Sequence, residues 1–298
     1  LPQSRRNGGK VSSGQTRDED INVTVRYVTA GEGPAVLMVH GLGASLSIWE
    51  KNIAPLAQGH TVYAIDLPGS GKSDKPKFLD YHSAAGAKFL IRLMDTLGIN
   101  RATLMGNSGG GLVTTICALT YPERVDKLVL VDSAGLGRQM AWFLRLASLP
   151  FLGELLHIPN VRNPDNLIKS IFYEPQLVSA AALEDIMEAR NTSLGKRVTL
   201  EELRSGVSLG GLRKDMMMLQ KLKDYAKPLL IVWGEEDRLI PVSHAYHARR
   251  VLVCDSDEGD TTAPYRAVHV IPHCGHWPQM ERPDEFNPLV LRFLDGGL

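Results

Sequence analysis

Several features that define other protein classes are scarce or missing in this sequence. It holds three cysteines among 298 residues, Cys117, Cys254 and Cys274, and their spacing fits neither a disulfide framework nor a metal site. No apolar run approaches the roughly 20 residues that cross a bilayer. Residues 1–20 also lack the apolar core of a signal peptide. We therefore expect a cytoplasmic protein without a membrane partner.

An excess of charge of one sign is missing as well. The 33 lysines and arginines balance the 33 aspartates and glutamates, so a basic surface for nucleic acid is not indicated. Two asparagines, Asn22 and Asn191, begin glycosylation-type triplets, which we take as coincidental in a chain without a secretory signal. A small molecule is the expected partner, and both a monomer and a homodimer remain open.

Strand-like apolar runs alternate with helix-like segments, which is typical of a mostly parallel α/β sheet covered by helices on both faces. The polar residues 1–20 are expected to form a flexible N-terminal arm, and residues 21–29 an edge strand. Helical spacing of apolar residues predicts helices at 82–97 and 284–294. The buried strands are expected at residues 35–40, 61–66, 102–106, 127–132, 228–234 and 267–272.

Residues 135–222 have a different character. They are rich in leucine, methionine, alanine and charged residues, with helical periodicity and no convincing strand, and candidate helices lie at 177–190 and 199–205. The segment is too long for a structureless loop, so it is predicted to be a helical lid domain. The core domain then consists of residues 21–134 and 223–298. The acidic segment 255–264 is expected to be a solvated loop.

The most informative motif is Gly106-Asn107-Ser108-Gly109-Gly110, between a strand-like run and a helix-like run. A serine on such a sharp turn needs small residues two positions before and after it, because the strained backbone leaves no room for side chains. The motif therefore predicts a nucleophile elbow that holds the Ser108 hydroxyl at a helix N-terminus.

A serine hydroxyl needs a base to take its proton, and the base needs a carboxylate to orient it. Asp237 follows one predicted strand and His276 follows the next, so the chain order is Ser, Asp, His. Glu235 and Glu236 are rival carboxylates. We predict a catalytic triad of Ser108, Asp237 and His276, and no metal site.

The oxyanion that forms during attack needs preorganised N–H donors. The backbone N–H groups of Gly109 and of Leu42, in His40-Gly41-Leu42-Gly43, are the predicted donors. His40 is interpreted as a structural residue. Residues of the lid and of the His276 loop are candidates for an apolar substrate pocket, namely Trp142, Phe143, Met217, Arg190 and Trp277.

Gly71-Lys72-Ser73 has the form of the end of a phosphate-binding loop. That motif requires a glycine five positions before Gly71, where this chain has Asp66. A nucleotide site is therefore not expected.

The chain resembles the α/β-hydrolase family over residues 21–297. The resemblance rests on residues 40–43, on residues 66–73 (Asp-Leu-Pro-Gly-Ser-Gly-Lys-Ser), on the elbow at 106–110, and on Asp237 and His276. It implies an eight-stranded sheet with a helical cap inserted after the sixth strand. It further implies a serine hydrolase that forms an acyl-enzyme and needs no cofactor.

Residues 274–287 are similar to a narrower group, the carbon–carbon hydrolases that cleave ring-fission products of aromatic degradation. The sequence departs from that group at three points. It has Leu42-Gly43-Ala44-Ser45 in place of a Ser-Gly-Pro-Gly-like loop, and Gly109 in place of methionine after the nucleophile. Arg190, the candidate for the arginine that binds the substrate carboxylate, falls about one helical turn from the expected position.

Three functions are therefore open. Hydrolysis of carboxylic esters with small or medium acyl chains is the main prediction. Hydrolysis of a carbon–carbon bond in vinylogous diketo acids, with the same triad, is the alternative. A noncatalytic small-ligand-binding module is the third, because a fold does not by itself define a function. Ser108 excludes the aspartate-nucleophile route of dehalogenases and epoxide hydrolases.

Overall fold

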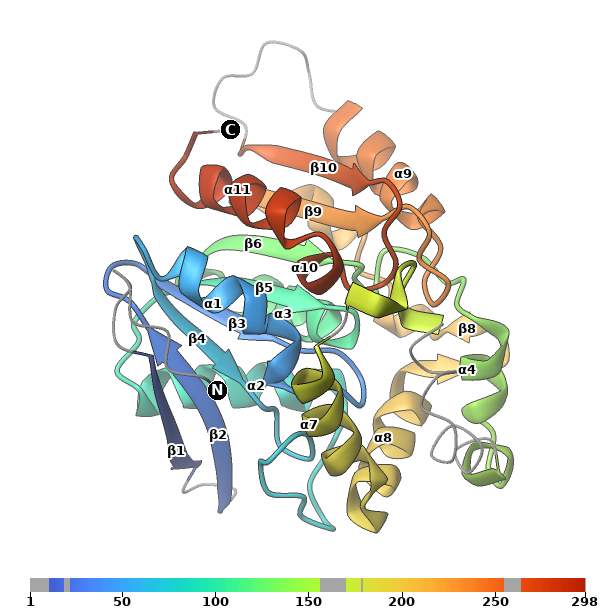
Figure 1. Ribbon diagram of the computed structural model, residues 1–298. Coiled ribbons are helices and arrows are strands. Elements are labelled where there is room, and N and C mark those ends of the chain that lie inside the picture. The colour runs from blue at the N-terminus through green and yellow to red at the C-terminus, as the bar shows by residue number, and fades with distance from the viewer. Residues whose placement is uncertain (1–10, 19–21, 156–169, 178, 255–263, 298) are drawn as a thin grey trace.

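The computed structural model describes residues 11–18, 22–155, 170–177, 179–254 and 264–297. A mostly parallel sheet of eight strands lies at its centre, as predicted (Figure 1). The strands are Ser12–Asp18 (β1), Val23–Ala30 (β2), Ala35–Val39 (β3), Thr61–Ile65 (β4), Ala102–Asn107 (β5), Val125–Val131 (β6), Leu229–Gly234 (β9) and Arg266–Ile271 (β10). Their order is β1-β2-β4-β3-β5-β6-β9-β10, and only the β1–β2 and β2–β4 pairs are antiparallel.

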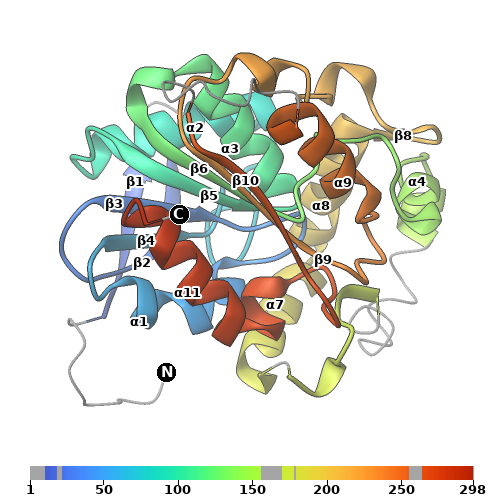
Figure 2. The ribbon, with the colours of Figure 1, turned by 90° about the horizontal axis from the view of Figure 1, so that it is seen from above.

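Helices cover both faces of this sheet (Figure 2). On one face lie α1 (Glu50–Leu56) and α11 (Pro283–Leu294), and on the other lie α2 (Ser83–Thr96), α3 (Gly109–Thr120) and α9 (Ser243–Arg249). Alternate strand residues enter two separate cores: Leu37 packs on the α2–α3 side and Met38 on the α1–α11 side. Burial on both faces explains the near-continuous apolar runs of the central strands. The helices expected at 82–97 and 284–294 are confirmed as α2 and α11.

Shorter helical segments join these elements. They are Leu46–Trp49, Pro122–Arg124, Pro175–Leu177, Lys214–Met216 and Lys221–Asp224, all 3-10 helices, the π-helix Arg250–Cys254, and α10 (Pro278–Glu281). Cys117 and Cys274 are buried free thiols. None of the helices in the described part of the chain has the length and apolar character that crossing a bilayer requires.

The expectation of a flexible N-terminal arm is wrong for residues 12–18, because they form β1 at the edge of the sheet. The strand predicted at 21–29 is therefore the second strand, and not the edge. β1 pairs with β2 along its whole length, and its last residue, Asp18, is buried and lies 2.7 Å from the guanidinium of Arg92. Backbone pairing and this ion pair hold β1, and neither leaves an apolar pattern in the sequence.

The described residues between β6 and β9, here called the helical insert, lie beyond the carboxyl ends of the parallel strands (Figure 1). The insert contains α4 (Trp142–Ala147), α7 (Ala180–Asn191), α8 (Ser193–Gly206) and a hairpin of β7 (Val207–Ser208) and β8 (Gly211–Leu212). The expectation that it holds no strand is wrong at this hairpin, whose two-residue strands are too short for a periodic signal. α8 begins before residue 199 because the Thr192 side chain caps it, accepting the N–H of Gly195.

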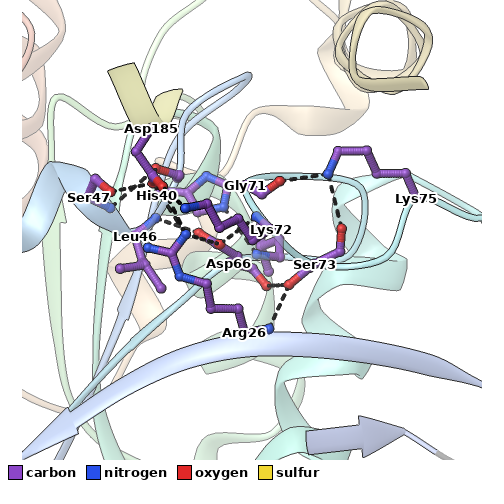
Figure 3. Close-up of polar contacts among 12 residues, drawn as sticks. Arg26, His40, Leu46, Ser47, Asp66, Gly71, Lys72, Ser73, Lys75 and Asp185 are labelled. Carbon is purple, nitrogen blue, oxygen red and sulfur yellow. Dashed lines mark hydrogen bonds and ion pairs between the residues drawn. The ribbon is translucent and has the colours of Figure 1, made fainter. Parts of the chain in front are cut away.

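A polar network fastens α7 of the insert to the core (Figure 3). Asp185 of α7 accepts hydrogen bonds from the hydroxyl groups of Ser45, at 3.0 Å, and Ser47, at 2.5 Å. Arg26 of β2 donates to the same carboxylate at 3.0 Å, and Nζ of Lys72 lies 3.1 Å from it. Because these donors come from three separate segments of the core, one carboxylate holds α7 against all of them.

Asp66, which follows β4, is the second acid of this network (Figure 3). It is fully buried and accepts the backbone N–H groups of Leu46 and Lys72 at 2.7 and 2.8 Å. A Cβ on Gly71, whose φ is +49°, would lie 2.1 Å from the Asp66 carboxylate. The Gly71-Lys72-Ser73 loop is thus wrapped around an internal aspartate, an arrangement that leaves no room there for a phosphate.

We predict that Asp185→Asn lowers the free energy of unfolding in a pH-dependent way. Burial alone raises the pKa of Asp185, but hydrogen bonds from Ser47, Arg26 and Lys72 outweigh it and bring the pKa to about 2. A lowered folded-state pKa stabilises the fold above the unfolded value of roughly 3.9, and this stabilisation disappears as the pH falls toward 2. Urea unfolding should show a loss of about 1–2 kcal/mol at pH 7.

The loss should shrink between pH 4 and pH 2. Glu188→Gln, on the exposed side of the same helix, controls for removing a negative charge from α7. An equal loss at pH 2.5 and pH 7 would contradict the ion-pair explanation.

Candidate active site

Ser108 lies on a sharp turn between β5 and α3. Its φ of 55° and ψ of −120° are unfavourable for a residue with a side chain, so surrounding contacts must hold it there. Its N–H donates to Val131 O at 2.9 Å, and its carbonyl accepts the N–H of Ala134 at 3.0 Å. The contacts come from the last residue of β6 and from the turn that follows this strand, which together fix the elbow.

The glycines around Ser108 are required by close backbone approach. A Cβ on Gly106 would lie 2.4 Å from the carbonyl oxygen of Gly110, and a Cβ on Gly110 would lie 2.2 Å from that of His40. These distances are far below a normal contact, so neither position accepts a side chain. This is the steric requirement from which the sequence predicts a nucleophile elbow.

The loop after β3 lies directly against the elbow. A Cβ on Gly41 would come within 2.8 Å of the Ser108 Cβ, and a Cβ on Gly109 would lie 3.5 Å from the backbone nitrogen of Leu42. The backbones of Leu42 and Gly109 therefore lie close together beside Ser108. Such closeness is required if their N–H groups are to share one oxyanion, as the sequence predicts.

Asp237 and His276 meet at the ends of β9 and β10. The Nδ1–H of His276 donates to Oδ2 of Asp237 over 2.7 Å, and both side chains are buried. The other carboxylate oxygen of Asp237 accepts the N–H groups of Leu239 and Ile240 at 2.7 and 3.0 Å. These donors fix the carboxylate plane and the imidazole that it orients.

The rival carboxylates have other positions. Glu235 is exposed, and Glu236 accepts the N–H of Cys274 at 2.8 Å. Of the three acidic residues in this turn, Asp237 is the one that pairs with His276.

Asn107, the residue before the nucleophile, connects the serine and histidine loops. Its side-chain amide donates to Val131 O at 3.1 Å and to the carbonyl oxygen of His276 at 3.2 Å. The N–H of His276 donates to Ile171 O, at 2.6 Å, in the helical insert. Core and insert together therefore position the His276 loop, and Ser108 and His276 line the same cavity.

His40 is a structural residue, in keeping with its sequence interpretation. Its Nδ1 lies 2.8 Å from Gly41 O, and its Nε2 accepts the N–H of Leu67 at 3.1 Å. Nε2 therefore carries no proton, and Nδ1 is the donor. Burial lowers the pKa of His40 below its usual range, although the charge of Asp66 opposes this effect. A neutral imidazole thus bridges the loops that follow β3 and β4.

The cavity above the elbow has a volume of about 750 Å³ and lies between the core loops and the insert. Trp142, Phe143 and Trp277 line it, as predicted, although Trp142 is 67% exposed. The expectation for Met217 is wrong: it packs against the core and is not among the described lining residues. Its side chain is partly buried, and contact with the core is favoured over full exposure to solvent. The side chain of Arg190 lies outside the described residues.

Two carboxyl groups of the site are not among the sequence predictions. Asp132 follows β6 and lies beside Asp237 and His276, and Glu202 of α8 lines the cavity. Burial, with a smaller contribution from the charge of Glu201, raises the pKa of Glu202 to about 8. The sequence could have identified Asp132 as a site residue, because it stands at the end of a predicted buried strand. The sequence could not have identified Glu202, because it looks like any other polar residue of an amphipathic helix.

Asp132, Asp237 and His276 also form a possible metal-ligand group within the described residues, with one ligand atom of each within 4.8 Å of the others. Their chemistry fits a metal poorly. Oδ2 of Asp237 and Nδ1 of His276 already bond to each other, and Oδ1 of Asp237 accepts two backbone N–H groups.

A family model described as the alpha/beta hydrolase fold matches residues 34–155. The 2-hydroxy-6-oxo-6-phenylhexa-2,4-dienoate hydrolase of Comamonas testosteroni is 32% identical to this chain over 276 residues, covering 91% of each chain. The chain belongs to the α/β-hydrolase family, and the resemblance stated from its sequence motifs is confirmed.

Solved structures agree with this assignment. A membrane phospholipase A, described as a bacterial virulence factor, has a TM-score of 0.79 at 28% identity, over 96% of this chain and 86% of its own. A meta-cleavage product hydrolase from Pseudomonas fluorescens IP01 has a TM-score of 0.74 at 27% identity, over 93% and 96%. The chain is a hydrolase by family, and the names of these relatives describe different substrates.

We predict that Gly110→Ala destabilises the protein strongly, because the new methyl group would meet the His40 carbonyl at 2.2 Å. The expected loss in urea unfolding exceeds about 3 kcal/mol. Gly59→Ala is the matched control, since a Cβ there meets nothing within 4 Å, and it should stay within about 0.5 kcal/mol of wild type. Equal stability of the two variants would contradict the close packing of the elbow.

Proposed function

We propose that this chain is a serine hydrolase in which Ser108 attacks a carbonyl carbon and forms an acyl-enzyme. The observation that carries the proposal is the 2.7 Å hydrogen bond between His276 and Asp237, at the wall of the cavity that Ser108 also lines. No metal or organic cofactor has a role in these steps.

The geometry supports a separate role for each of the three side chains, Ser108, His276 and Asp237. Asp237 holds Nδ1 of His276 as the donor, so Nε2 is the nitrogen that takes the proton of Ser108. As the proton moves to His276, the Asp237 carboxylate stabilises the imidazolium. The same proton then passes to the leaving group, and a water molecule activated by His276 releases the acid and restores Ser108.

The negative charge of the tetrahedral intermediate falls on the substrate oxygen. In the proposed complex, the backbone N–H groups of Leu42 and Gly109 donate to this oxygen. Because backbone donors held by close packing need no reorganisation, such a site stabilises the transition state more than the ground state.

For the substrate, we propose a carbon–carbon bond in a vinylogous diketo acid. Support comes from the relative that is 32% identical over nine-tenths of this chain, which is named for a substrate of this class. The volume of about 750 Å³ and the lining by Trp142, Phe143 and Trp277 suit a conjugated apolar chain. Cleavage is possible in such a molecule because the departing carbanion is delocalised into the second carbonyl group.

Carboxylic ester hydrolysis is the second candidate, and a specific feature of the cavity favours it. Among the described lining residues the cations are Lys88 and Arg92, both on α2, and Arg92 pairs with Asp18. Gly109 also has no side chain that would occupy space beside the nucleophile. A cavity of this kind accepts a neutral acyl chain, and the phospholipase A of similar fold is itself an ester hydrolase by name.

A substrate panel should separate these candidates. We predict that the purified chain cleaves a dienoic ring-fission product at least about tenfold faster, in kcat/KM, than p-nitrophenyl esters of any acyl length. Ser108→Ala should reduce both rates by more than about a thousandfold. Ser243→Ala, at the exposed start of α9, is the control for serine replacement.

A higher kcat/KM on the esters than on the dienoic acid would make ester hydrolysis the favoured function. Tight binding of a small ligand without hydrolysis of any substrate would instead indicate a noncatalytic module.

Glu202 gives a pH test of the anionic substrate. Below pH 8 its carboxyl group is protonated and can donate a hydrogen bond to a substrate carboxylate. Above pH 8 it is ionised and repels that carboxylate. We predict that KM for the dienoic acid rises severalfold between pH 7 and pH 9, and that Glu202→Gln removes the rise. KM for a neutral ester should stay flat in both proteins. A flat KM for the acid in wild type would place its carboxylate away from Glu202.

A further inference from the structure

Asp132 is a buried acid that the proposed reaction does not use. It directly follows β6, its side chain has no exposed surface, and its φ of 45° lies in the left-handed region. Its Oδ1 accepts the N–H of Gly234 at 3.0 Å. The residue thus adopts an unfavourable backbone conformation that directs a carboxyl group into the interior, which invites a functional explanation.

The second oxygen of Asp132 has no donor. Oδ2 is buried and unpaired among the described residues, and an oxygen of Asp132, an oxygen of Asp237 and a ring nitrogen of His276 all lie within 4.8 Å of one another. A buried carboxylate oxygen without a donor is costly. Its neighbour Asp237 is itself a carboxylate, so one of the two must carry a proton to make a hydrogen bond.

The charges around Asp132 favour the protonated form. Asp237 follows β9, His276 and Cys274 belong to the loop after β10, and Glu281 lies on α10. Burial raises the pKa of Asp132 well above its usual range, and the charges of Asp237 and Glu281 raise it further. The N–H of Gly234 opposes this effect only in part.

The proton is assigned to Asp132 rather than to Asp237 by the remaining donors. Asp237 accepts two backbone N–H groups and the Nδ1–H of His276, and three donors stabilise its ionised form. Asp132 accepts one. The two acids therefore differ in their supply of hydrogen bonds, and the proton belongs to the acid with fewer.

We propose that Asp132 is a protonated positioning residue, which donates a hydrogen bond to Asp237 and holds this carboxylate ionised and aligned with His276. The kinetic part of this proposal rests on the proposed function of Ser108, whereas the protonation of Asp132 does not. Asp132 is not among the described residues that line the cavity, so it acts through Asp237 and does not touch the substrate.

Two variants test the positioning. Asp132→Asn keeps an oxygen for the N–H of Gly234 and an N–H for Asp237, so it reproduces the protonated acid. Asp132→Ala removes both. We expect Asp132→Asn to keep kcat within about threefold of wild type and Asp132→Ala to lower kcat about tenfold or more. KM should stay unchanged in both. A loss in Asp132→Asn as large as that in Asp132→Ala would overturn the proposal.

The proton itself is tested by thermal unfolding at several pH values, a readout that needs no activity. The unfolded chain releases the Asp132 proton near pH 4, whereas the folded protein keeps it to higher pH. Wild type therefore loses stability as the pH rises through this window, and Asp132→Asn does not. The midpoint of Asp132→Asn relative to wild type should rise by a few degrees between pH 4 and pH 8.

Asp215→Asn, at an exposed position, should show no such rise. A difference independent of pH would mean that Asp132 is ionised in the folded protein. Activity lost on chelation and regained with a divalent cation would assign the cluster to a metal. Both results would overturn the proposal. Full activity of Ser108→Ala would instead refute the proposed function and leave the thermal result standing.

Discussion

The parallel pairing of the central strands is the constraint on which the whole site depends. Because β3, β5, β6, β9 and β10 run in one direction, their carboxyl ends meet at one edge of the sheet. The residue or short loop that follows each strand must then share this edge with the others. Ser108, Asp132, Asp237 and His276, far apart in the chain, become neighbours for this reason.

The helical insert converts that edge into a cavity. Ile171 accepts the N–H of His276, and Phe172 packs edge-to-face on Trp277 with the ring centroids 5.3 Å apart. Asp185 holds α7 against β2 and the loops after β3 and β4. The insert is thus fastened at two places, and the shape of the cavity depends on contacts other than those of Ser108.

The sequence predicts best those features that leave a local pattern. The central strands have near-continuous apolar runs, α2 and α11 have periodic apolar residues, and the elbow has glycines that sterics require. β1 and the β7–β8 hairpin leave no pattern, since one is polar and the other has two-residue strands. Trp142, Phe143 and Met217 illustrate the limit for the pocket. All three are apolar residues of the insert, and only tertiary packing places Met217 against the core and away from the described cavity lining.

Three carboxyl groups of the site differ in their burial and in the hydrogen-bond donors that reach them. Asp237 accepts three N–H donors, whereas Asp132 accepts one, and burial together with the charge of Asp237 raises the pKa of Asp132. Glu202 faces the cavity without a cationic partner among the described residues, and its pKa rises to about 8. Similar side chains can in this way serve as an anion that orients His276, a donor that supports this anion, and a pH-dependent wall of the cavity. Burial and the number of N–H groups that reach each oxygen distinguish these carboxyl groups, and only the folded structure defines both quantities.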